Sequence, residues 1–303
     1  MAIKLSTYLK SKYGEKIYRL SLSSGCSCPN RDGSLGFSGG CTFCSEGGSG
    51  EFASSFKDID LQIEEAKALI RKKTDARRFI AYFQSYTNTY GDVNRLKDLY
   101  LRTIQRDDIV ALSVGTRPDC LCPEILDMLK ALNAIKPVIV ELGLQTIHEE
   151  TARRVRRGYE LSVFEEAYRN LKSIGVDVVV HVIFGLPGES REDMLNTVRY
   201  LSEMAPALDG IKIQNLQILK GTDMYQEYLK WKKDGEDPSE FHIMDMEEYT
   251  DLVAEAIALL PEGCVVHRMT GDGPRKLLVD PLWSLDKKRV LNTLTRKTKD
   301  ILK

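Results

Sequence analysis

Cysteine spacing gives the first chemical signal in the sequence, because four of the seven cysteines fall within nineteen residues. Cys41 and Cys44 are close enough to share one metal centre, and Cys28 adds a third thiol across a glycine-rich loop. Cys26 and Cys28 are one residue apart and point opposite ways in an extended chain, so their joint ligation is awkward. Three thiolates suit a centre with an open position. Structural zinc using Cys26 or a distant His is the alternative.

The other cysteines carry less signal. The number of cysteines is odd, and the amino terminus lacks the apolar region of a signal peptide. Both observations argue against a disulfide framework. Cys120 and Cys122 are also one residue apart, which is poor geometry for joint metal binding, so both stay off the ligand set. Cys264 lies between Gly263 and Val265 and is expected to be structural.

Composition indicates a folded protein of the cytoplasm. Hydrophobic residues make up 43% of the 303 positions, which excludes a disordered chain. No apolar run approaches the roughly 20 residues that span a bilayer. Lys and Arg number 43 against 44 Asp and Glu, so the net charge of -1 argues against a generally basic nucleic-acid binder. We therefore expect a cytoplasmic location and no membrane partner.

Apolar, strand-like runs alternate with amphipathic helical segments. The runs are rich in Val and Ile, as in strands buried on both faces of a parallel sheet; they cover Ile17–Leu22, Phe79–Phe83, Ile109–Val114, Val138–Leu142, Val178–Phe184, Ile211–Leu219 and Val265–Arg268. The helical segments cover Asp60–Lys73, Val93–Arg106, Pro123–Leu132, Leu161–Ile174, Arg191–Met204 and Met246–Leu260. Ser190 and Pro123 have the character of helix starts. The alternation predicts βαβ units in an open sheet or an incomplete barrel, with the charged Trp231–Phe241 segment as a surface excursion.

Polar motifs follow the apolar runs almost immediately. FQSYTNTY comes after the second run, GTRPDC after the third and GLPGES after the fifth, while ELGLQT lies at the fourth and QILKGT at the sixth. The carboxyl ends of parallel strands meet at one edge of the sheet, where binding and catalytic groups collect. We therefore expect these motifs to form one site.

The cysteine loop, CPNRDG…GGCTFC, resembles the cluster-binding loop of the radical S-adenosylmethionine (SAM) superfamily. Together with YFQSYTNTY, VGTRPDCL, VELGLQTIHEET…RRGY, VIFGLPGE, LKGT and HRMTGDGPR…PLWSLDK, it looks like the Elp3-related YhcC/YtqA-type subgroup. The resemblance implies an α/β fold, a partial (β/α)6 TIM-like barrel with short amino- and carboxyl-terminal extensions. It implies one domain over residues 1–303, with a core at about 17–220 and an extension at about 221–303 that closes the barrel mouth.

The same resemblance implies two cofactors. A [4Fe-4S] cluster would be held by Cys28, Cys41 and Cys44, and SAM would bind the fourth iron through its amino and carboxylate groups. Transfer of an electron to SAM would give a 5′-deoxyadenosyl radical that takes hydrogen from a substrate C–H bond. A flavodoxin- or ferredoxin-type partner would supply the electron.

Ten positions match positions that bind SAM or lie near it in the family. Phe43 would shield the cluster and approach adenine, and Arg157 is the expected contact to the SAM carboxylate. The full set is Phe43, Gln84, Ser85, Asn88, Thr116, Arg117, Glu141, Gln145, Arg157 and Gly185.

Several of these positions have structural alternatives. Ser85 and Asn88 could merely cap the next helix. Arg117 could form a structural pair with Asp119. Glu141 is expected near ribose hydroxyls, and its charge inside the apolar run VIVELGL is costly without a partner, which favours function.

Substrate contacts are expected from the sixth strand and the late glycine-rich motif: Gln214, Asn215, Gln217, Arg268 and Asp272. The subgroup commonly carries histidines where this chain has Gln214 and Gln217, and an amide is able to read a base edge. Gln214 and Asn215 cannot both face inward from one strand. Asp272 would read an amine or amidine, or belong to a packed turn. His181 is expected in the core, with a catalytic role kept open by its family position.

The resemblance leads to a modified nucleobase as substrate. The favoured activity is that of a queuine lyase, which cleaves a C–N bond of the free base queuine to give the aminomethyl-deazaguanine precursor preQ1 in queuosine salvage. Near-neutral charge and no appended basic domain favour the free base over tRNA. The alternatives are a radical SAM enzyme acting on the modified wobble uridine of tRNA, and a zinc-bearing, noncatalytic RNA-binding module.

Overall fold

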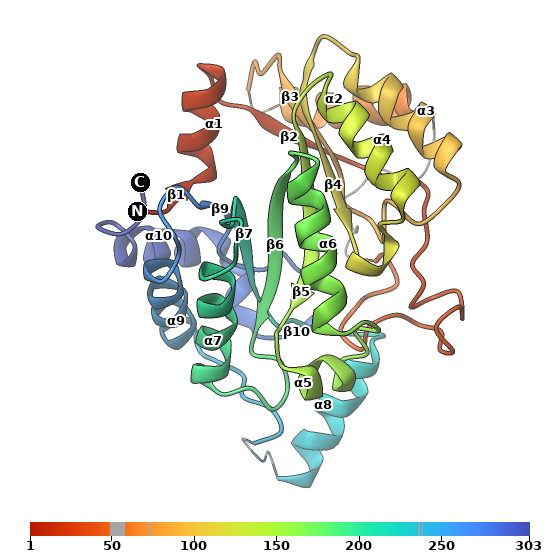
Figure 1. The fold of residues 1–303 in the computed structure, drawn as a ribbon. Helices are drawn as coiled ribbons and strands as arrows, with labels where there is room; N and C mark the ends of the chain where they lie inside the picture. Colours follow the sequence, from red (N-terminus) through yellow and green to blue (C-terminus); the bar gives the residue numbers. More distant parts are fainter. Residues whose placement is uncertain (49–57, 73, 236, 238) are drawn as a thin grey trace.

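A computed structural model describes residues 1–48, 58–72, 74–235, 237 and 239–303 (Figure 1). Its central feature is one parallel sheet of eight strands, in the order β1-β9-β7-β6-β5-β4-β3-β2. The strands are β1 (Ile3–Lys4), β2 (Tyr18–Leu22), β3 (Phe79–Phe83), β4 (Ile109–Thr116), β5 (Val138–Gln145), β6 (Asp177–Phe184), β7 (Gly210–Asn215) and β9 (Val265–Arg268).

Helices connect the strands and cover the outer face of the sheet (Figure 1). Five of them lie between successive strands from β2 to β7: α2 (Ile59–Arg71), α3 (Val93–Ile104), α4 (Pro123–Asn133), α6 (Leu161–Ser173) and α7 (Arg191–Ser202), with the short α5 (Glu149–Arg154) before α6. The sheet curls into a half-barrel, so the predicted partial (β/α)6 barrel is confirmed. Strands β9 and β1 extend it beyond the six predicted core strands.

Local sequence explains these elements. Every residue of β3 is buried, as expected for a strand covered on both faces. Helix α7 starts after Ser190, whose side chain forms a capping box with Asp193, and Pro123 opens α4; both predicted helix starts are confirmed. The predicted Asp60–Lys73 helix is α2, with Lys73 outside the described residues.

Two predicted segments need correction. The run Ile211–Leu219 is not one strand, because the chain leaves the sheet after Asn215; β8 (Ile218–Leu219) instead pairs antiparallel with β10 (Leu278–Asp280). The segment Trp231–Phe241 is not simply a surface excursion. Helix α8 (Asp223–Asp234) includes Trp231, whose ring packs with Phe241 in a small apolar cluster, although residues 236 and 238 lie outside the description.

Residues from both ends of the chain complete the fold (Figure 1). β1 pairs with β9, Ala2 bridges to Leu302, and Lys4 N donates to Lys303 O at 2.7 Å. The last third of the chain adds α9 (Met246–Ala258) and α10 (Lys287–Lys297), while α1 (Leu5–Tyr13) follows β1. The predicted domain boundaries stay a prediction; β1, before the predicted core, pairs with β9 in the predicted extension. None of the helices in the described ranges is long and apolar enough to cross a membrane.

Side chains also link the two edge regions of the curled sheet. Arg19, on the edge strand β2, donates to Nδ1 of His267 on β9 at 2.7 Å. Arg19 also pairs with Glu141 on β5 at 3.3 Å. These contacts run through the interior of the half-barrel, beneath the cavity described below.

Phe164 tests the packing between α6 and the sheet. Its side chain is fully buried, so Phe164→Ala should lower the free energy of unfolding by about 3–5 kcal/mol through lost contacts and a cavity. Leu69, which is 64% exposed, gives the control: Leu69→Ala should change it by less than about 0.5 kcal/mol. Urea unfolding of both variants measures the difference, and equal midpoints would contradict the packing.

Candidate functional site

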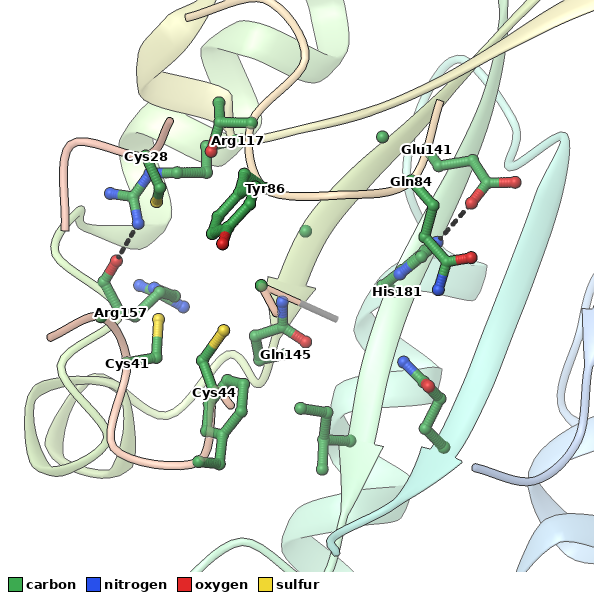
Figure 2. Close-up of a pocket in the computed structure, with 18 of the residues that line it drawn as sticks. Cys28, Cys41, Cys44, Gln84, Tyr86, Arg117, Glu141, Gln145, Arg157 and His181 are labelled. Carbon is green, nitrogen blue, oxygen red and sulfur yellow. Dashed lines mark hydrogen bonds and ion pairs between the residues drawn. The ribbon is translucent and has the colours of Figure 1, made fainter. Parts of the chain in front are cut away.

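A cavity of about 230 Å³ opens inside the curled sheet, toward the carboxyl ends of its strands (Figure 2). Side chains from the cysteine loop (residues 28–44) form one wall, and residues of β3 to β7 and β9 form the other. Of the eighteen predicted site residues, fourteen line this cavity: Cys28, Cys41, Phe43, Cys44, Gln84, Thr116, Arg117, Glu141, Gln145, Arg157, Gln214, Asn215, Gln217 and Arg268.

Three thiols face one end of the cavity. Figure 2 shows the sulfurs of Cys41 and Cys44 directed toward the space below Cys28. Burial, with the nearby Cys44 thiol, raises the pKa of Cys41 to about 12, so the metal-free thiol stays protonated at neutral pH. Among the described residues, no three His, Cys, Asp or Glu side chains are close enough to enclose a single metal ion. Cys26 is buried elsewhere, 3.3 Å from Arg95 Nη2.

The two residues after Cys28-Pro29 donate to the other two sulfurs. Asn30 Nδ2 lies 3.2 Å from Cys41 Sγ, and Arg31 Nη2 lies 3.3 Å from Cys44 Sγ. Hydrogen bonds of this kind stabilise negative charge on thiolate sulfur. The donor set of three thiols with two N–H partners therefore fits an iron–sulfur cluster.

The cysteine loop is fixed against the segment that follows α5. Asn30 Nδ2 donates to the carbonyls of Arg156 and Arg157, and Thr42 N donates to Val155 O at 3.1 Å. Gly158 has φ +84°, and a side chain there would meet Asn30 Oδ1 at 2.6 Å. The RRGY motif thus supplies a close-packed backbone for the loop.

Arg117 and Arg157 hold in place the segment that supports the cysteine loop. Arg117 pairs with Asp119 at 2.7 Å and donates to Arg157 O at 2.9 Å, which is the structural alternative considered for it. Arg157 is 1% exposed, and its guanidinium donates to Thr146 O and Tyr159 O and pairs with Glu149. These contacts hold the Arg157 guanidinium within the chain, and its contact with the SAM carboxylate stays a prediction.

Three other predicted SAM contacts lie outside the cavity wall. Asn88 is fully buried, accepts from Ser24 Oγ at 2.6 Å, and donates to the carbonyls of Phe83 and Gly115. It ties the ends of β3 and β4 together. Ser85 is buried, and Gly185, with φ +87°, faces Met244. These three residues therefore support the frame of the site, and their contacts with SAM stay predictions.

Glu141 sits at the centre of a buried charged network. Its carboxylate pairs with Lys212 Nζ and Arg19, and accepts from Ser113 Oγ at 3.0 Å. His181 Nε2 lies 3.1 Å away (Figure 2). The buried charge of Glu141 thus has the partners that it requires, and they are protein side chains. Its proximity to ribose stays a prediction.

Sequence reasoning missed Arg19 and Lys212 in this network. A charged residue inside an apolar strand, the signal that marks Glu141, also marks these two. Lys212 interrupts the apolar run GIKIQN, and Arg19 interrupts IYRLSL. Tyr82, whose hydroxyl accepts from Lys212 Nζ at 3.0 Å, also lines the cavity and was missed. Alternation along β3 points Tyr82 to the same face as Gln84.

The network perturbs two ionisations. Burial alone would raise the pKa of Glu141, but Lys212 and Arg19 hold that pKa well below its ordinary value. Burial, reinforced by Lys212, lowers the pKa of His181 to about 4. Glu141 is therefore ionised and His181 neutral at physiological pH.

The expected substrate residues divide into two groups. Arg268 Nη1 donates to Gln214 Oε1 at 3.2 Å in the cavity wall, and Gln217 Nε2 lies 3.3 Å from Ser284 Oγ. Asn215 Oδ1 accepts from Gly271 N at 2.8 Å, so its amide holds the glycine-rich turn; of the adjacent pair, it is the structural member.

Asp272 lies away from the other expected substrate residues, and its contact with an amine or amidine stays a prediction. Its carboxylate forms an exposed ion pair with Lys287 and lies outside the cavity lining. The glycine-rich turn contributes through its backbone instead: side chains at Gly271 or Gly273 would collide with Gln217. The turn therefore packs Gln217 into place, as the alternative considered for this motif supposes.

Backbone strain marks the strand ends next to the thiols. Gln145 has φ +70° at a β-bulge that ends β5, and Tyr86 has φ +60° after β3. Non-glycine residues rarely adopt this conformation, which costs about 1–3 kcal/mol and clusters at functional sites. Both side chains line the cavity near Cys44 (Figure 2), although only Gln145 was predicted.

His181 gives a pH-dependent prediction. Below its ordinary pKa of about 6.5, the imidazole is protonated in the unfolded chain but neutral in the fold, so the unfolded state binds more protons. The free energy of unfolding should therefore fall as the pH drops from 7 to 5, by up to about 1.4 kcal/mol per pH unit from this group. His181→Gln should flatten the dependence in urea titrations; an unchanged slope would contradict the assignment.

Comparison with known proteins agrees with this architecture. The model of the Radical SAM superfamily matches residues 36–201, and that of the Radical_SAM C-terminal domain matches residues 208–300. YtqA of Bacillus subtilis is 37% identical over 293 residues, covering 96% of this chain and 88% of that protein. YhcC of Escherichia coli is 35% identical over 276 residues, covering 91% and 85%.

Solved structures show the same fold. Archaeal Elp3 of Methanocaldococcus infernus has a TM-score of 0.64 at 21% identity, covering 79% of this chain and 59% of that one. Coproporphyrinogen III oxidase (HemN) of Escherichia coli has a TM-score of 0.53 at 17% identity, covering 83% and 54%. Two family models in sequence, long relatives and a shared half-barrel lead to one conclusion: the chain belongs to the radical SAM superfamily, and its relatives include YtqA, YhcC and Elp3 proteins.

Proposed function

We propose that this radical SAM enzyme fragments a modified nucleobase, with free queuine as substrate and the deazaguanine preQ1 as product of C–N cleavage. Members of the family use a [4Fe-4S] cluster and SAM. One observation carries the proposal: a single cavity joins three thiols at one end to an amide-lined wall at the other. Such a wall offers neutral donors and acceptors for a base.

Cys28, Cys41 and Cys44 would hold the cluster. When bound, the cluster and SAM supply a 5′-deoxyadenosyl radical that abstracts hydrogen from substrate. Phe43, between two of these residues, lines the cavity and packs against the apolar cluster of α8. The chain's task is then to hold the substrate C–H close and exclude water.

The substrate wall recognises hydrogen-bonding groups. Arg268 donates to the oxygen of Gln214, so the pair presents N–H donors to the cavity, which suit a ring carbonyl. Gln84 and Gln145 contribute amides from neighbouring strand ends. Glu141, compensated by Lys212, fixes the strands behind this wall.

A second candidate is a wobble uridine of tRNA, and two observations favour it. The tRNA uridine(34) acetyltransferase of Methanocaldococcus infernus is 32% identical over 175 residues, covering 56% of this chain and 30% of that protein. In addition, the exposed Lys288, Arg289, Arg296 and Lys299 give α10 and its end a basic surface of the kind that binds phosphates. Sequence reasoning overlooked this cluster.

A reducing cytoplasm is the proposed setting, because it keeps the thiols free for metal. There a flavodoxin- or ferredoxin-type protein would deliver the electron. The proposed substrate depends on neither the electron donor nor the compartment.

Iron loading tests the cluster assignment. After anaerobic reconstitution, wild-type protein should be brown with about four irons per chain. Alanine at Cys28, Cys41 or Cys44 should lower the iron content severalfold, because each change removes one ligand. Cys26→Ala is the matched control and should load normally. Normal loading without any one of the three, or a colourless protein with one zinc, would contradict the assignment.

Turnover tests the substrate. Reconstituted enzyme with SAM, a reductant and queuine should release 5′-deoxyadenosine and preQ1, followed by mass spectrometry. Arg268→Gln should raise KM about tenfold or more, since about 1.4 kcal/mol of binding corresponds to tenfold. If queuine is not consumed while a tRNA uridine side chain is converted, the ranking of the two candidates is reversed.

A further inference from the structure

We propose that Asn30 and Arg31 act as positioning residues that hold the cluster through its cysteine sulfurs and raise its reduction potential. The inference concerns electron entry and is independent of the substrate. It does rest on the proposed cluster position at Cys28, Cys41 and Cys44.

The side-chain amide of Asn30 contacts both the Cys41 sulfur and the backbone that follows α5. It is fully buried, and its Nδ2 lies 3.2 Å from Cys41 Sγ while also donating to Arg156 O at 2.7 Å. Asn30 O accepts from Gly40 N at 2.8 Å, which closes the loop just before Cys41. The amide therefore fixes the position of the Cys41 sulfur relative to the segment after α5.

Asn30 also has a buried oxygen without a hydrogen-bond partner, Oδ1. A lost hydrogen bond of this kind costs about 1–3 kcal/mol. The amide keeps its orientation because Nδ2 satisfies the sulfur and the backbone carbonyls together. The unpartnered Oδ1 is therefore the cost of holding the N–H group against the Cys41 sulfur.

Arg31 brings a positive charge to the second sulfur. Its Nη2 lies 3.3 Å from Cys44 Sγ and 3.2 Å from Cys44 O, and it also donates to Ser45 O. Its guanidinium lies 5.5 Å from the centre of the Tyr86 ring, which supports it from the cavity side. Charge-assisted donation to a sulfur is stronger than neutral donation.

The direction of the effect follows from charge. One-electron reduction adds a negative charge to the cluster and its thiolates, and the electron comes from the external donor. N–H donors and a nearby cation stabilise the more negative, reduced form more than the oxidised one. Removing them therefore makes the potential more negative and the electron harder to accept.

The chain offers a matched control. Arg95 Nη2 lies 3.3 Å from Cys26 Sγ, which reproduces the arginine–sulfur contact at a cysteine outside the cavity. Arg95→Gln and Arg31→Gln thus make the same chemical change at two sulfurs. Only one of these sulfurs is expected to bind iron.

The experiment is a redox titration of reconstituted protein without substrate, followed by the electron paramagnetic resonance signal of the reduced cluster. Iron content and thermal melting are measured on the same samples. Arg31→Gln should shift the midpoint by about 59 mV or more to negative values, a tenfold change in the ratio of reduced to oxidised cluster for one electron. Arg31→Lys, which keeps the charge, should shift it less, and Arg95→Gln should match wild type.

Each outcome decides the inference. Wild-type iron content with a wild-type midpoint in Arg31→Gln overturns it, as does an equal shift in Arg95→Gln. Normal melting with reduced iron in Arg31→Gln supports the holding role. If Arg31→Gln does not fold, Arg31→Met, which also removes the charge and the N–H donors, replaces it, and a wild-type midpoint there is the overturning result. Failure of the cluster assignment appears separately, as iron retained after the cysteines are replaced.

Discussion

The ion pair between Glu141 and Lys212 is the interaction on which the arrangement of the site depends. It joins β5 to β7 inside the half-barrel, and Arg19 extends it to the edge strand β2. Buried charges of this kind are expensive to separate, because removal of one partner leaves the other uncompensated. Strands far apart in the sheet order are thereby held around one cavity.

Above this network, structural and chemical work is divided among different residue types. Arg117 and Arg157, which lie near the thiols, donate hydrogen bonds to Asp119, Glu149 and backbone carbonyls. Both arginines also line the cavity, together with amides and tyrosines. Arg117 and Arg157 thus shape the loop that carries the cysteines, while the amides and Arg268 offer hydrogen-bonding groups to the space that a cofactor and substrate would share.

Much of the fold was predictable because buried parallel strands have a clear apolar pattern. The run Val178–Phe184 and the start of α7 at Ser190 are examples, since each depends on local chemistry. The break after Asn215 was not predictable, because Leu216–Leu219 remains apolar while changing sheets. Pairing with β10 decides that change, and this information lies sixty residues further along the chain.

The site shows the same limit more strongly. Motif position correctly gathered the cysteines and Gln145 around one cavity, but it could not tell which polar side chain faces inward. Asn88 and Asp272 matched expected positions, yet one bonds to strand carbonyls and the other to Lys287. The interrupted apolar run marks Lys212 as unusual, but it does not show that its partner is Glu141, which is distant in sequence. Such pairings are set by tertiary structure.

The contact between Arg19 and His267 has a consequence for biosynthesis. Arg19 leaves the ribosome 248 residues before His267 of β9, and β1 also waits for β9. Loop closure over such a separation is slow compared with pairing of neighbouring strands. The nascent chain would therefore assemble its middle strands first and keep the inner face accessible until β9 has been made.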